Sequence, residues 1–356
     1  MIVRRIAVFS CVSLALFVAL GPAYAQEPRT LDIYFLDMVG GGSTLIVTPS
    51  GESVLIDTGS LRPEHRDADR ILKVCEDAKL KQIDFLVTTH FHSDHFGAIL
   101  EVSQRIPVKC FIDKGTRAPA SDGDSRWSKD LYSLYEQATQ GNVKIVRAGD
   151  DIPLRNDPAG KAPAAKLHCV ASDKKVEGFD GDIDAPVDGF KMESADDSDN
   201  ARSIALLLTC GSFKFFAGGD ITRNVEHHLV QPVNRIGKVD LYQVTHHGWD
   251  LSNNDLLLKA LAPTVCVAMN GPRKGIMPQT FRILAALPSL KALYQIHYNT
   301  QYGDTGNTRP EFIANPQDNP GKGEFIKASV QPDKGTFTLQ IGATGEKRTY
   351  SIQPKS

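Results

Sequence analysis

The sequence predicts an α/β fold in which strands and helices form layers. In the first third of the chain, "LDIYFLDM", "STLIVTP" and "SVLIDTG" have the apolar and β-branched composition of strands, and "PSGES" has that of a turn. An amphipathic helix is predicted over residues 67–80, where Ile71, Leu72, Val74 and Cys75 recur at helical spacing. The strand "QIDFLVTTH" follows this helix. Strands that alternate with helices are typical of layered α/β domains.

The same alternation returns in the second half of the chain. "SIALLLTCGSFKFFAGGD" predicts two strands joined by a tight turn, and "VDLYQVTHHG" and "PTVCVAMNG" predict two more strands on either side of the helix "NNDLLLKALA". A further helix is predicted in "PQTFRILAALPSLKALY" up to Pro288, and a final hairpin in "GTFTLQIGATGEKRTYSI". We therefore expect one domain that spans residues 26–356.

Residues from about 115 to 200 are interpreted as a loop-rich insertion between these halves. A helix is predicted in "SRWSKDLYSLYEQATQ" and a hairpin in "NVKIVRAGDDIPL". In contrast, "NDPAGKAPAAK" and "DGDIDAPVDGFKMESADDSDN" have the Pro, Gly and Asp content of loops. The acidic run is interpreted as a solvated face of the protein.

The first residues indicate export. Arg4 and Arg5 precede an apolar run over residues 6–20, and the small-residue pattern Ala23-Tyr24-Ala25 follows. This order predicts a secretory signal peptide over residues 1–25 that is cleaved after Ala25, and hence a periplasmic or secreted protein. A retained membrane anchor is the alternative, but the apolar run is shorter than the roughly twenty residues that span a bilayer. No membrane span is expected after cleavage.

The charge balance argues against a protein that holds nucleic acid stably. The chain carries 40 basic and 42 acidic residues, and loss of Arg4 and Arg5 moves the formal net charge from −2 to −4. Proteins that bind polyanions without specificity usually have the opposite balance. A local basic groove would not appear in this sum.

The cysteines exclude two kinds of chemistry. Cys11 leaves with the signal peptide, and the remaining five are widely spaced, with no C-x-x-C pair. Thiolate zinc sites and thioredoxin-like redox chemistry are therefore not expected. The five are interpreted as buried free thiols. They are Cys75, Cys110, Cys169, Cys210 and Cys266.

A cluster of histidines and one aspartate in "LVTTHFHSDHFGAIL" directly follows a predicted strand. In an extended segment, residues two apart face the same way, so His90 and His92 can converge on one cation. Asp94 and His95 lie past the bend and can bind a second cation. Imidazole and carboxylate ligands suit zinc, iron or manganese. A polar surface loop is the alternative, and the preceding apolar strand favours the metal site.

Potential ligands also end three other predicted strands. Asp57 ends "VLIDTG", Asp220 ends "FFAGGD", and His246 and His247 end "LYQVTHHG". Taken singly, Asp57 could be a turn residue and Asp220 a helix N-cap. Since sites in layered α/β folds are built from strand ends, we expect these residues to join one binuclear site. His227 and His228, in the helix after Asp220, are interpreted as surface residues.

On these residues the chain resembles the metallo-β-lactamase fold hydrolases. "HFHSDHFG" is similar to the H-x-H-x-D-H motif of that superfamily, and the resemblance extends over roughly residues 31–299. Within it, "IYFLDMVGGGSTLIVTPSGESVLIDTG", "NARSIALLL", "FFAGGD" and "VTHHGW" resemble the hydrolase domain attached to ComEC-type DNA-uptake proteins. The resemblance implies a four-layer αβ/βα sandwich with two divalent metal ions between the sheets. Zinc is the first expectation, with manganese or iron as alternatives.

The resemblance also implies roles for single residues. His90 and His92 would hold one metal, and Asp94 and His95 the other. Asp220 would bridge the two metals. An aspartate at that position favours an oxygen-rich site of the phosphoesterase kind, and it excludes the β-lactamase class that has a cysteine ligand there.

The resemblance leaves the last ligand of each metal less clearly assigned. His246 directly follows its strand and is the first choice to complete the second metal site, with His247 beside it or facing the substrate. Asp57 would orient a ligand histidine, as metal-bound imidazoles usually require. Most relatives have a further histidine about twenty residues before the bridging aspartate. The present sequence has "DDSDNARS" there, so Asp199, Asn200 or water would take its place.

Other departures and candidates concern the substrate side. The G-Q-G-D of the resembled branch is replaced by Gly40-Gly41-Gly42-Ser43. Lys274, with Arg273, could bind a phosphate, although a solvated turn is the alternative. His297 could contact substrate, although a structural role is favoured. Trp249 could form a wall of the pocket or pack elsewhere.

The expected function is hydrolysis by a metal-activated water. Two divalent cations lower the pKa of a shared water and supply hydroxide, and the catalytic Asp94 would hold that water. The expected substrate is a phosphodiester, either a small molecule or an oligonucleotide. A lactone or β-lactam hydrolase is one alternative, and a metal-binding module without activity is the other.

Overall fold

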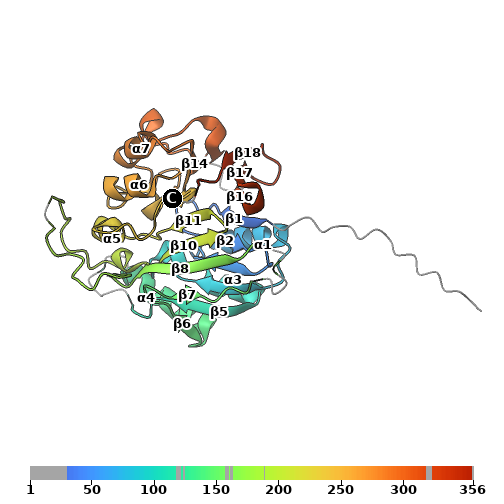
Figure 1. Ribbon diagram of the computed structural model, residues 1–356. Helices are drawn as coiled ribbons and strands as arrows, with labels where there is room; N and C mark the ends of the chain where they lie inside the picture. Colours follow the sequence, from blue (N-terminus) through green and yellow to red (C-terminus); the bar gives the residue numbers. More distant parts are fainter. Residues whose placement is uncertain are drawn as a thin grey trace, which may run out of the picture.

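The computed structural model describes residues 30–117, 122, 125–156, 160, 163–187, 189–317 and 323–354. The predicted signal peptide lies outside these residues. The described chain forms two large mixed sheets that face each other, with helices on their outer sides (Figure 1). In spatial order, the first sheet contains β18 (Arg348–Ser351), β17 (Thr336–Ile341), β16 (Ile326–Gln331), β1 (Leu31–Phe35), β2 (Thr44–Val47), β3 (Ser53–Ile56), β4 (Ile83–Val87), β5 (Val108–Asp113) and β6 (Val143–Ile145).

The second sheet has the same character, and short helices connect many of the strands. Its strands in spatial order are β15 (Ile313–Asn315), β14 (Ala292–His297), β13 (Val265–Ala268), β12 (Leu241–Gln243), β11 (Phe213–Ala217), β10 (Ala205–Cys210), β8 (Ala165–Ser172) and β7 (Asp151–Ile152), with β9 (Lys175–Val176) paired to β8. The helices are α1 (Arg66–Asp77), α2 (Ser93–Phe96), α3 (Ile99–Arg105), α4 (Ser125–Thr139), α5 (Arg223–Val230), α6 (Asp255–Leu261) and α7 (Pro278–Ala285). Short 3-10 turns include η2 (Asn200–Arg202) and η3 (Thr245–Gly248).

Three apolar clusters hold four layers together. Leu31, Ile33 and Phe35 of β1 join the cluster between the two sheets, while Tyr34 of the same strand joins the cluster under α1, α3 and α4. A third cluster lies between the second sheet and α5, α6 and α7. Because alternate residues of a strand face opposite sides of a sheet, each sheet needs an apolar neighbour on both faces. The predicted αβ/βα sandwich is confirmed.

Parallel strands in each sheet bring the loops of the candidate site to one edge. β3, β4 and β5 are parallel in the first sheet, and β11, β12 and β13 are parallel in the second. Parallel neighbours place their carboxyl ends at the same edge of a sheet. Asp57 directly follows β3, and the His90 loop follows β4. Asp220 and the His246-His247 pair follow β11 and β12.

One strand prediction is wrong in its pairing. The segment expected to be a hairpin contains β6, which pairs with β5 in the first sheet, and β7, which pairs with β8 in the second. The chain crosses between the sheets here because Val146 and Ile152 both bury their side chains in the cluster between them. The two other predicted hairpins, β10–β11 and β17–β18, are antiparallel pairs as expected.

The insertion contains more regular structure than expected. Its strand β8 is eight residues long and pairs with β10 in the second sheet, and α4 packs on the first sheet. β5, β8 and β16 were not among the predicted strands. The predicted helices after residues 67 and 278 end earlier than expected, at Asp77 and Ala285.

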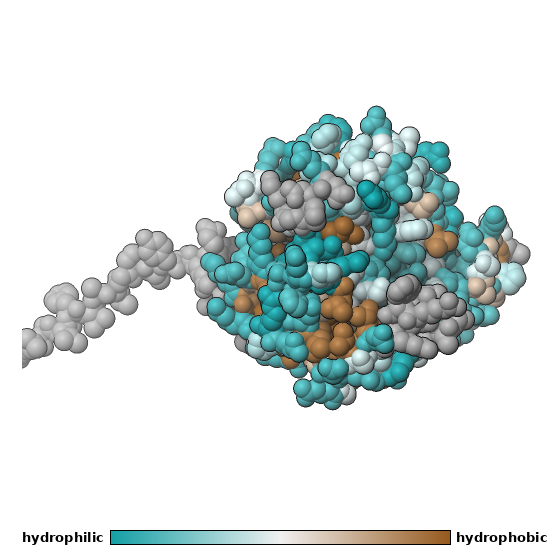
Figure 2. Space-filling model, turned by 180° about the vertical axis from the view of Figure 1, so that it is seen from behind, coloured by the Kyte–Doolittle hydropathy of each residue, from teal (hydrophilic) through white to brown (hydrophobic). Residues whose placement is uncertain are grey.

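The cysteine prediction is confirmed for the described residues. All five cysteines are free thiols, and Cys110 is half-buried whereas the other four are buried. None of the described helices combines the length and the apolar composition needed to cross a bilayer. The face turned away from the view of Figure 1 is mostly hydrophilic, and its apolar atoms gather in separate patches (Figure 2).

Candidate metal centre

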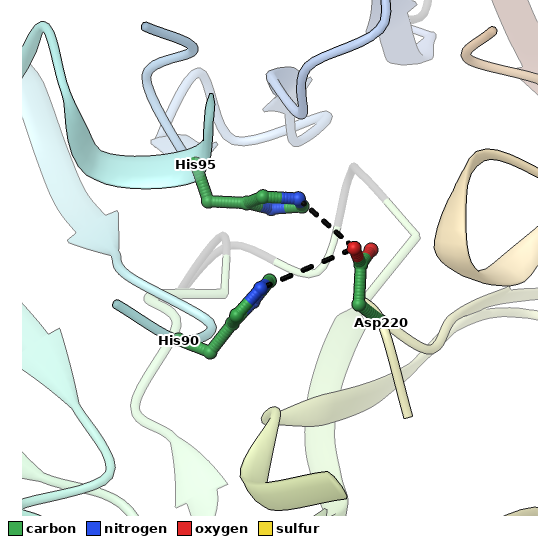
Figure 3. A group of neighbouring side chains, drawn as sticks. All are labelled: His90, His95 and Asp220. Carbon is green, nitrogen blue, oxygen red and sulfur yellow. Dashed lines mark ion pairs between the residues drawn. The ribbon is translucent and has the colours of Figure 1, made fainter. Parts of the chain in front are cut away.

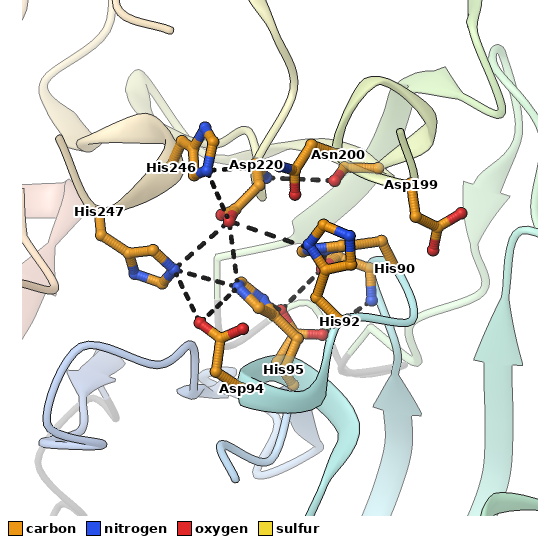
Figure 4. Close-up of polar contacts among 12 residues, drawn as sticks. His90, His92, Asp94, His95, Asp199, Asn200, Asp220, His246 and His247 are labelled. Atoms are coloured by element: carbon orange, nitrogen blue, oxygen red, sulfur yellow. Dashed lines mark hydrogen bonds and ion pairs between the residues drawn. The ribbon is translucent and has the colours of Figure 1, made fainter. Parts of the chain in front are cut away.

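Histidines from two loops at the common strand edge, one after β4 and one after β12, converge on one oxygen atom of Asp220, which follows β11 (Figures 3 and 4). Its Oδ2 lies 3.3 Å from His95 Nε2, 3.4 Å from His247 Nε2 and 3.6 Å from His246 Nε2. His90 Nε2 lies 4.0 Å from the same oxygen. All five residues are buried. Asp220 thus lies between histidines from two loops, and its predicted role as a bridge between two metal ions stays a prediction.

Asp94 joins His95 and His247 to form a compact group of ligand atoms. Asp94 Oδ2 lies 3.4 Å from His247 Nε2 and 3.7 Å from His95 Nε2, and the two Nε2 atoms are 3.1 Å apart. A second group of potential metal ligands consists of His90, His95 and Asp220. One imidazole nitrogen has a single lone pair, so His95 can bind only one of two metal ions. If Asp94, His95 and His247 hold one ion, His90 remains for the other, with Asp220 between them.

Hydrogen bonds outside the centre fix the rings of His90 and His95. The Thr89 hydroxyl donates to Asp57 Oδ2 at 2.8 Å, so its oxygen accepts from His90 Nδ1 at 3.0 Å. Asp57 Oδ2 also accepts from His95 Nδ1, at 2.8 Å. In both rings Nδ1 therefore carries a proton, and Nε2 faces Asp220. This contact is the one that the sequence predicted for Asp57.

The rings of His246 and His247 are also held through Nδ1 by oxygen atoms outside the centre. His247 Nδ1 donates to the carbonyl of Met269 at 3.2 Å. The Ser252 hydroxyl donates to the Ile221 carbonyl at 2.7 Å, so its oxygen accepts from His246 Nδ1 at 3.1 Å. In both rings Nδ1 therefore carries a proton, and Nε2 faces Asp220.

The geometry favours His247 over His246 as the ligand beside Asp94, contrary to the first choice from sequence. His247 belongs to the group with Asp94 and His95, whereas His246 does not. His246 Nε2 lies 3.4 Å from Asn200 Nδ2, which can donate to it. Both histidines have left-handed backbone, with φ of 53° and 54°, so strand alternation does not extend through them.

Buried polar atoms without partners support occupation by cations. His90 is fully buried, and its Nε2 has no hydrogen-bond partner. The Oδ1 of Asn200 is also buried without a partner. Such atoms are rare in folded proteins because each loses its hydration without compensation. Imidazole nitrogens and carboxylate oxygens around these atoms are the donor set that zinc and manganese bind, so the residues fit a metal centre.

The electrostatics of the centre also suit cations. Burial and the positive charges of His95 and His92 hold the pKa of His90 well below its usual range. Burial opposes ionisation of Asp94 and Asp220, but neighbouring positive charges lower both pKa values well below the usual range. These charges belong to Lys274 and two histidines at Asp94, and to histidines alone at Asp220. The centre therefore offers two ionised carboxylates at neutral pH, and His90 is a neutral imidazole there.

Two further histidines have pKa values that move in opposite directions. Burial lowers the pKa of His246 to about 4. Burial would also lower the pKa of His95, but the carboxylates of Asp220, Asp94 and Asp57 together raise it well above its usual range. A cation that binds the His95 ring would displace the proton held there.

His92 is close to His90 but points to a different partner. The two ring centroids are 4.7 Å apart, and the prediction that both histidines hold one cation stays a prediction. His92 Nε2 lies 2.8 Å from Asp122 Oδ2, and His92 does not join either ligand group. Asp122 is the residue of this site that sequence reasoning missed, because a single aspartate in the insertion carries no pattern.

The structure separates the two candidates for the absent histidine. Asp199 is fully buried, with its Oδ1 2.8 Å from Lys114 Nζ, and its Oδ2 accepts the Phe91 backbone N–H at 2.6 Å. Asp199 therefore holds the loop of the His90–His95 motif (the motif loop) in place and does not face the centre. Asn200 reaches His246 and keeps an unpartnered oxygen beside it.

Glycine is required where the motif loop meets the first strands. A Cβ atom on Gly42 would lie 2.7 Å from His95 Nδ1 and 3.2 Å from Asp57 Oδ2. A side chain at position 42 would push His95 away from Asp57. The Gly40-Gly41-Gly42 sequence thus lets the backbone pass directly beside the centre.

Lys274 and Trp249, whose positions the sequence left open, border the centre, whereas His297 does not. The Lys274 ammonium group contacts the Asp94 carboxylate and is about one third exposed. Trp249 stacks on His246 with ring centroids 6.1 Å apart and is partly exposed. His297 Nε2 instead lies 2.7 Å from Oδ1 of the buried Asp37. A structural role for His297 was the favoured interpretation, and its proposed substrate contact is not supported.

The surface prediction for His227 and His228 is wrong. Both side chains are 4% exposed. Their rings stack on Phe190 and Phe179 of the insertion, with centroids 4.1 Å and 3.9 Å apart. The insertion covers α5, and sequence periodicity within the helix cannot reveal a cover that comes from elsewhere.

Comparison with known proteins supports the assignment of the fold. Residues 37–169 match the family model described as the metallo-beta-lactamase superfamily. Over these residues the chain is similar to that superfamily. The matched stretch includes Asp57 and the whole His90–His95 motif, while Asp220 and the His246-His247 pair lie beyond it. The narrower resemblance to ComEC-type domains stays a prediction.

Individual relatives are distant and match only part of their own length. A metal-dependent hydrolase of Thermodesulfovibrio yellowstonii is 33% identical over 70 residues, which are 20% of this chain and 24% of that protein. The endoribonuclease YSH1 of Yarrowia lipolytica is 25% identical over 207 residues, 56% of this chain and 22% of that protein. The chain thus matches less than a quarter of the length of both. The CmlA β-hydroxylase of Streptomyces venezuelae is similar in structure, with a TM-score of 0.43 and 17% identity over 77% of this chain and 53% of that one.

Proposed function

We propose that this protein is an exported, binuclear metal-dependent hydrolase that cleaves phosphodiesters. The observation that carries the proposal is the convergence of four imidazoles on Asp220 Oδ2, with Asp94 beside His95 and His247. The relative named as a metal-dependent hydrolase supports hydrolysis, and the relative named as an endoribonuclease supports a phosphodiester substrate. Export rests on the signal-like sequence of residues 1–25.

The proposed ligands divide into two sets. Asp94, His95 and His247 would hold one cation, and His90, His92 and the Asn200 oxygen the other, with Asp220 shared. When bound, two divalent cations lower the pKa of water towards neutrality and polarise the phosphoryl group. Zinc is the first expectation, with manganese or iron as alternatives.

The chain's own residues would supply orientation and charge. Asp94 keeps its Oδ2 between His247 and the Lys274 ammonium group, and can accept a hydrogen bond from the attacking water. Lys274 places a positive charge at the exposed side of the centre. A phosphodiester is anionic whereas a lactone is neutral, so Lys274 favours the phosphodiester.

A phosphodiester could belong to a small molecule or to an oligonucleotide, and we propose no stable nucleic-acid complex. The exposed Trp249, which stacks on His246, and the exposed Leu251 two residues further along the chain keep a lactone or β-lactam hydrolase as the second candidate. Apolar groups of this kind suit the uncharged part of such substrates. A metal-binding module without activity is the remaining alternative, because Asn200 stands where relatives have a histidine.

One assay series separates these functions. The purified protein, loaded with zinc or with manganese, is given bis-p-nitrophenyl phosphate, a chromogenic β-lactam and a lactone. We expect phosphodiester turnover that is lost in Asp94→Ala. Turnover of the β-lactam or lactone alone would replace the proposal by the second candidate. Absence of turnover with two bound metals would indicate the binding module.

A further inference from the structure

Asp122 lies against the motif loop although it is far from the motif in sequence. Its side chain is 6% exposed, and its Oδ2 lies 2.8 Å from His92 Nε2. The same oxygen accepts the backbone N–H of Asp199 at 2.9 Å. A carboxylate with two short contacts to different segments is held in a defined position.

Asp199 connects this contact to the rest of the loop. It forms a fully buried ion pair with Lys114 at 2.8 Å and accepts the backbone N–H of Phe91, the residue before His92, at 2.6 Å. Asp122 and Asp199 therefore fix the same short segment through two neighbouring residues. Asp199 binds the backbone of Phe91, and Asp122 binds the imidazole of His92.

The orientation of His92 is opposite to that of the other histidines in the centre. His90, His95, His246 and His247 each have Nδ1 bound to an outer oxygen and Nε2 facing inwards. In His92 the outer oxygen is that of Asp122, and it binds Nε2. An ionised carboxylate accepts hydrogen bonds and has no proton to donate. In the neutral His92 ring, Nε2 therefore carries the proton and Nδ1 carries the lone pair.

We propose that Asp122 is a positioning residue for one of the two metal ions. It fixes the Nε2-protonated form of His92, so that Nδ1 is the nitrogen that binds the cation held with His90. The inference rests on the proposed binuclear centre. It also explains how that cation is bound without the absent histidine: a site with fewer donors depends more on the orientation of each one. Partners of this kind typically change metal affinity by about 10–100-fold.

The test measures zinc binding rather than activity. Zinc affinities of the full chain are determined by chelator competition for the wild type, Asp122→Ala and Asp122→Asn. The matched control is Asp151→Ala, which removes another carboxylate from a histidine, because Asp151 Oδ1 lies 2.6 Å from His168 Nδ1 away from the centre. We expect Asp122→Ala to weaken one of two binding steps by about 10–100-fold and to leave the other step unchanged.

The conservative variant distinguishes positioning from direct ligation. Asp122→Asn keeps an oxygen that can accept from His92 Nε2, so it should recover most of the lost affinity. Asp151→Ala should bind zinc like the wild type. Nitrogen-15 NMR of the metal-free protein at pH 8 should show His92 protonated on Nε2 in the wild type and a changed tautomer population in Asp122→Ala.

Each contrary result has a separate meaning. Unchanged zinc affinity in Asp122→Ala, or equal losses in Asp122→Ala and Asp122→Asn, would overturn the positioning role. Protonation of His92 on Nδ1 in the wild type would do the same. Failure of the wild type to bind two zinc ions would instead contradict the proposed function. If Asp122→Ala does not fold, Asp122→Asn and the tautomer measurement still decide.

Discussion

Two groups of buried histidines in this protein have opposite surroundings. The histidines of the metal centre face carboxylates, whereas His227 and His228 of α5 stack on phenyl rings. Both groups contain ring nitrogens without hydrogen-bond partners. Burial of an imidazole is therefore not enough to indicate a ligand. The centre differs because its nitrogens converge on one carboxylate oxygen from two loops, one after β4 and one after β12.

The largest expected effect follows from removing that oxygen. Asp220→Ala takes away the group that faces four imidazoles and should lower phosphodiesterase activity by more than about 100-fold, the upper size of effects from partners outside the ligand set. The double variant His227→Ala, His228→Ala should keep most of its activity when folded. Steady-state kinetics at saturating zinc measure both. Equal losses in the two proteins would remove the distinction between the groups.

The next effect separates the adjacent histidines. His247→Ala should lose one zinc-binding step, because its Nε2 lies within 3.5 Å of both Asp94 and Asp220. His246→Ala should keep two binding steps, because His246 is outside the ligand groups and Asn200 can donate to it. Chelator competition measures both variants. The opposite result would restore His246 as the ligand expected from sequence.

Much of the centre could be predicted from sequence, and the exceptions have physical reasons. His90, His92, Asp94 and His95 lie within six residues, so local geometry alone suggests two cations. Asp220 and Asp57 could be added because they end apolar strands. The choice between His246 and His247 could not be made, since their left-handed backbone breaks the alternation of the strand.

Long-range contacts explain what the sequence did not reveal. Asp122 meets His92 across thirty residues, and no spacing rule connects them. The stacking of Phe179 and Phe190 on α5 likewise depends on how the insertion folds back. The strands β1 to β4 were predicted because their composition is local evidence. The passage of the chain from the first sheet at β6 to the second sheet at β7 was missed. It depends on the burial of Val146 and Ile152 between the sheets and not on the residues of a local turn.

A smaller effect is expected at the substrate side. Lys274→Met removes the positive charge beside Asp94 and should raise KM for an anionic phosphodiester by about tenfold, which corresponds to about 1.4 kcal/mol. A neutral lactone should show no such change. The control is Lys259→Met, which removes an exposed ion pair with Asp255 on α6. A KM that does not depend on Lys274 would exclude it from phosphate binding.

The smallest effect concerns the α5 histidines and pH. Burial lowers the pKa of both His227 and His228 below the ordinary value of 6.5. The unfolded state therefore binds more protons than the folded state as pH falls below about 6.5, and the free energy of unfolding falls with it. Urea unfolding of the metal-free protein at pH 7.5 and 5.5 should show this loss. The loss should be smaller in the double variant His227→Asn, His228→Asn, and an equal loss would assign the pH dependence to other groups.

The central claim is that Asp220 lies between two metal ions. Crystals grown with zinc, measured on both sides of the zinc absorption edge, test it directly through anomalous difference density. We predict two peaks that flank Asp220, one beside Asp94, His95 and His247 and the other beside His90 and His92. A single peak, or a peak between His227 and His228 with none at Asp220, would contradict the account.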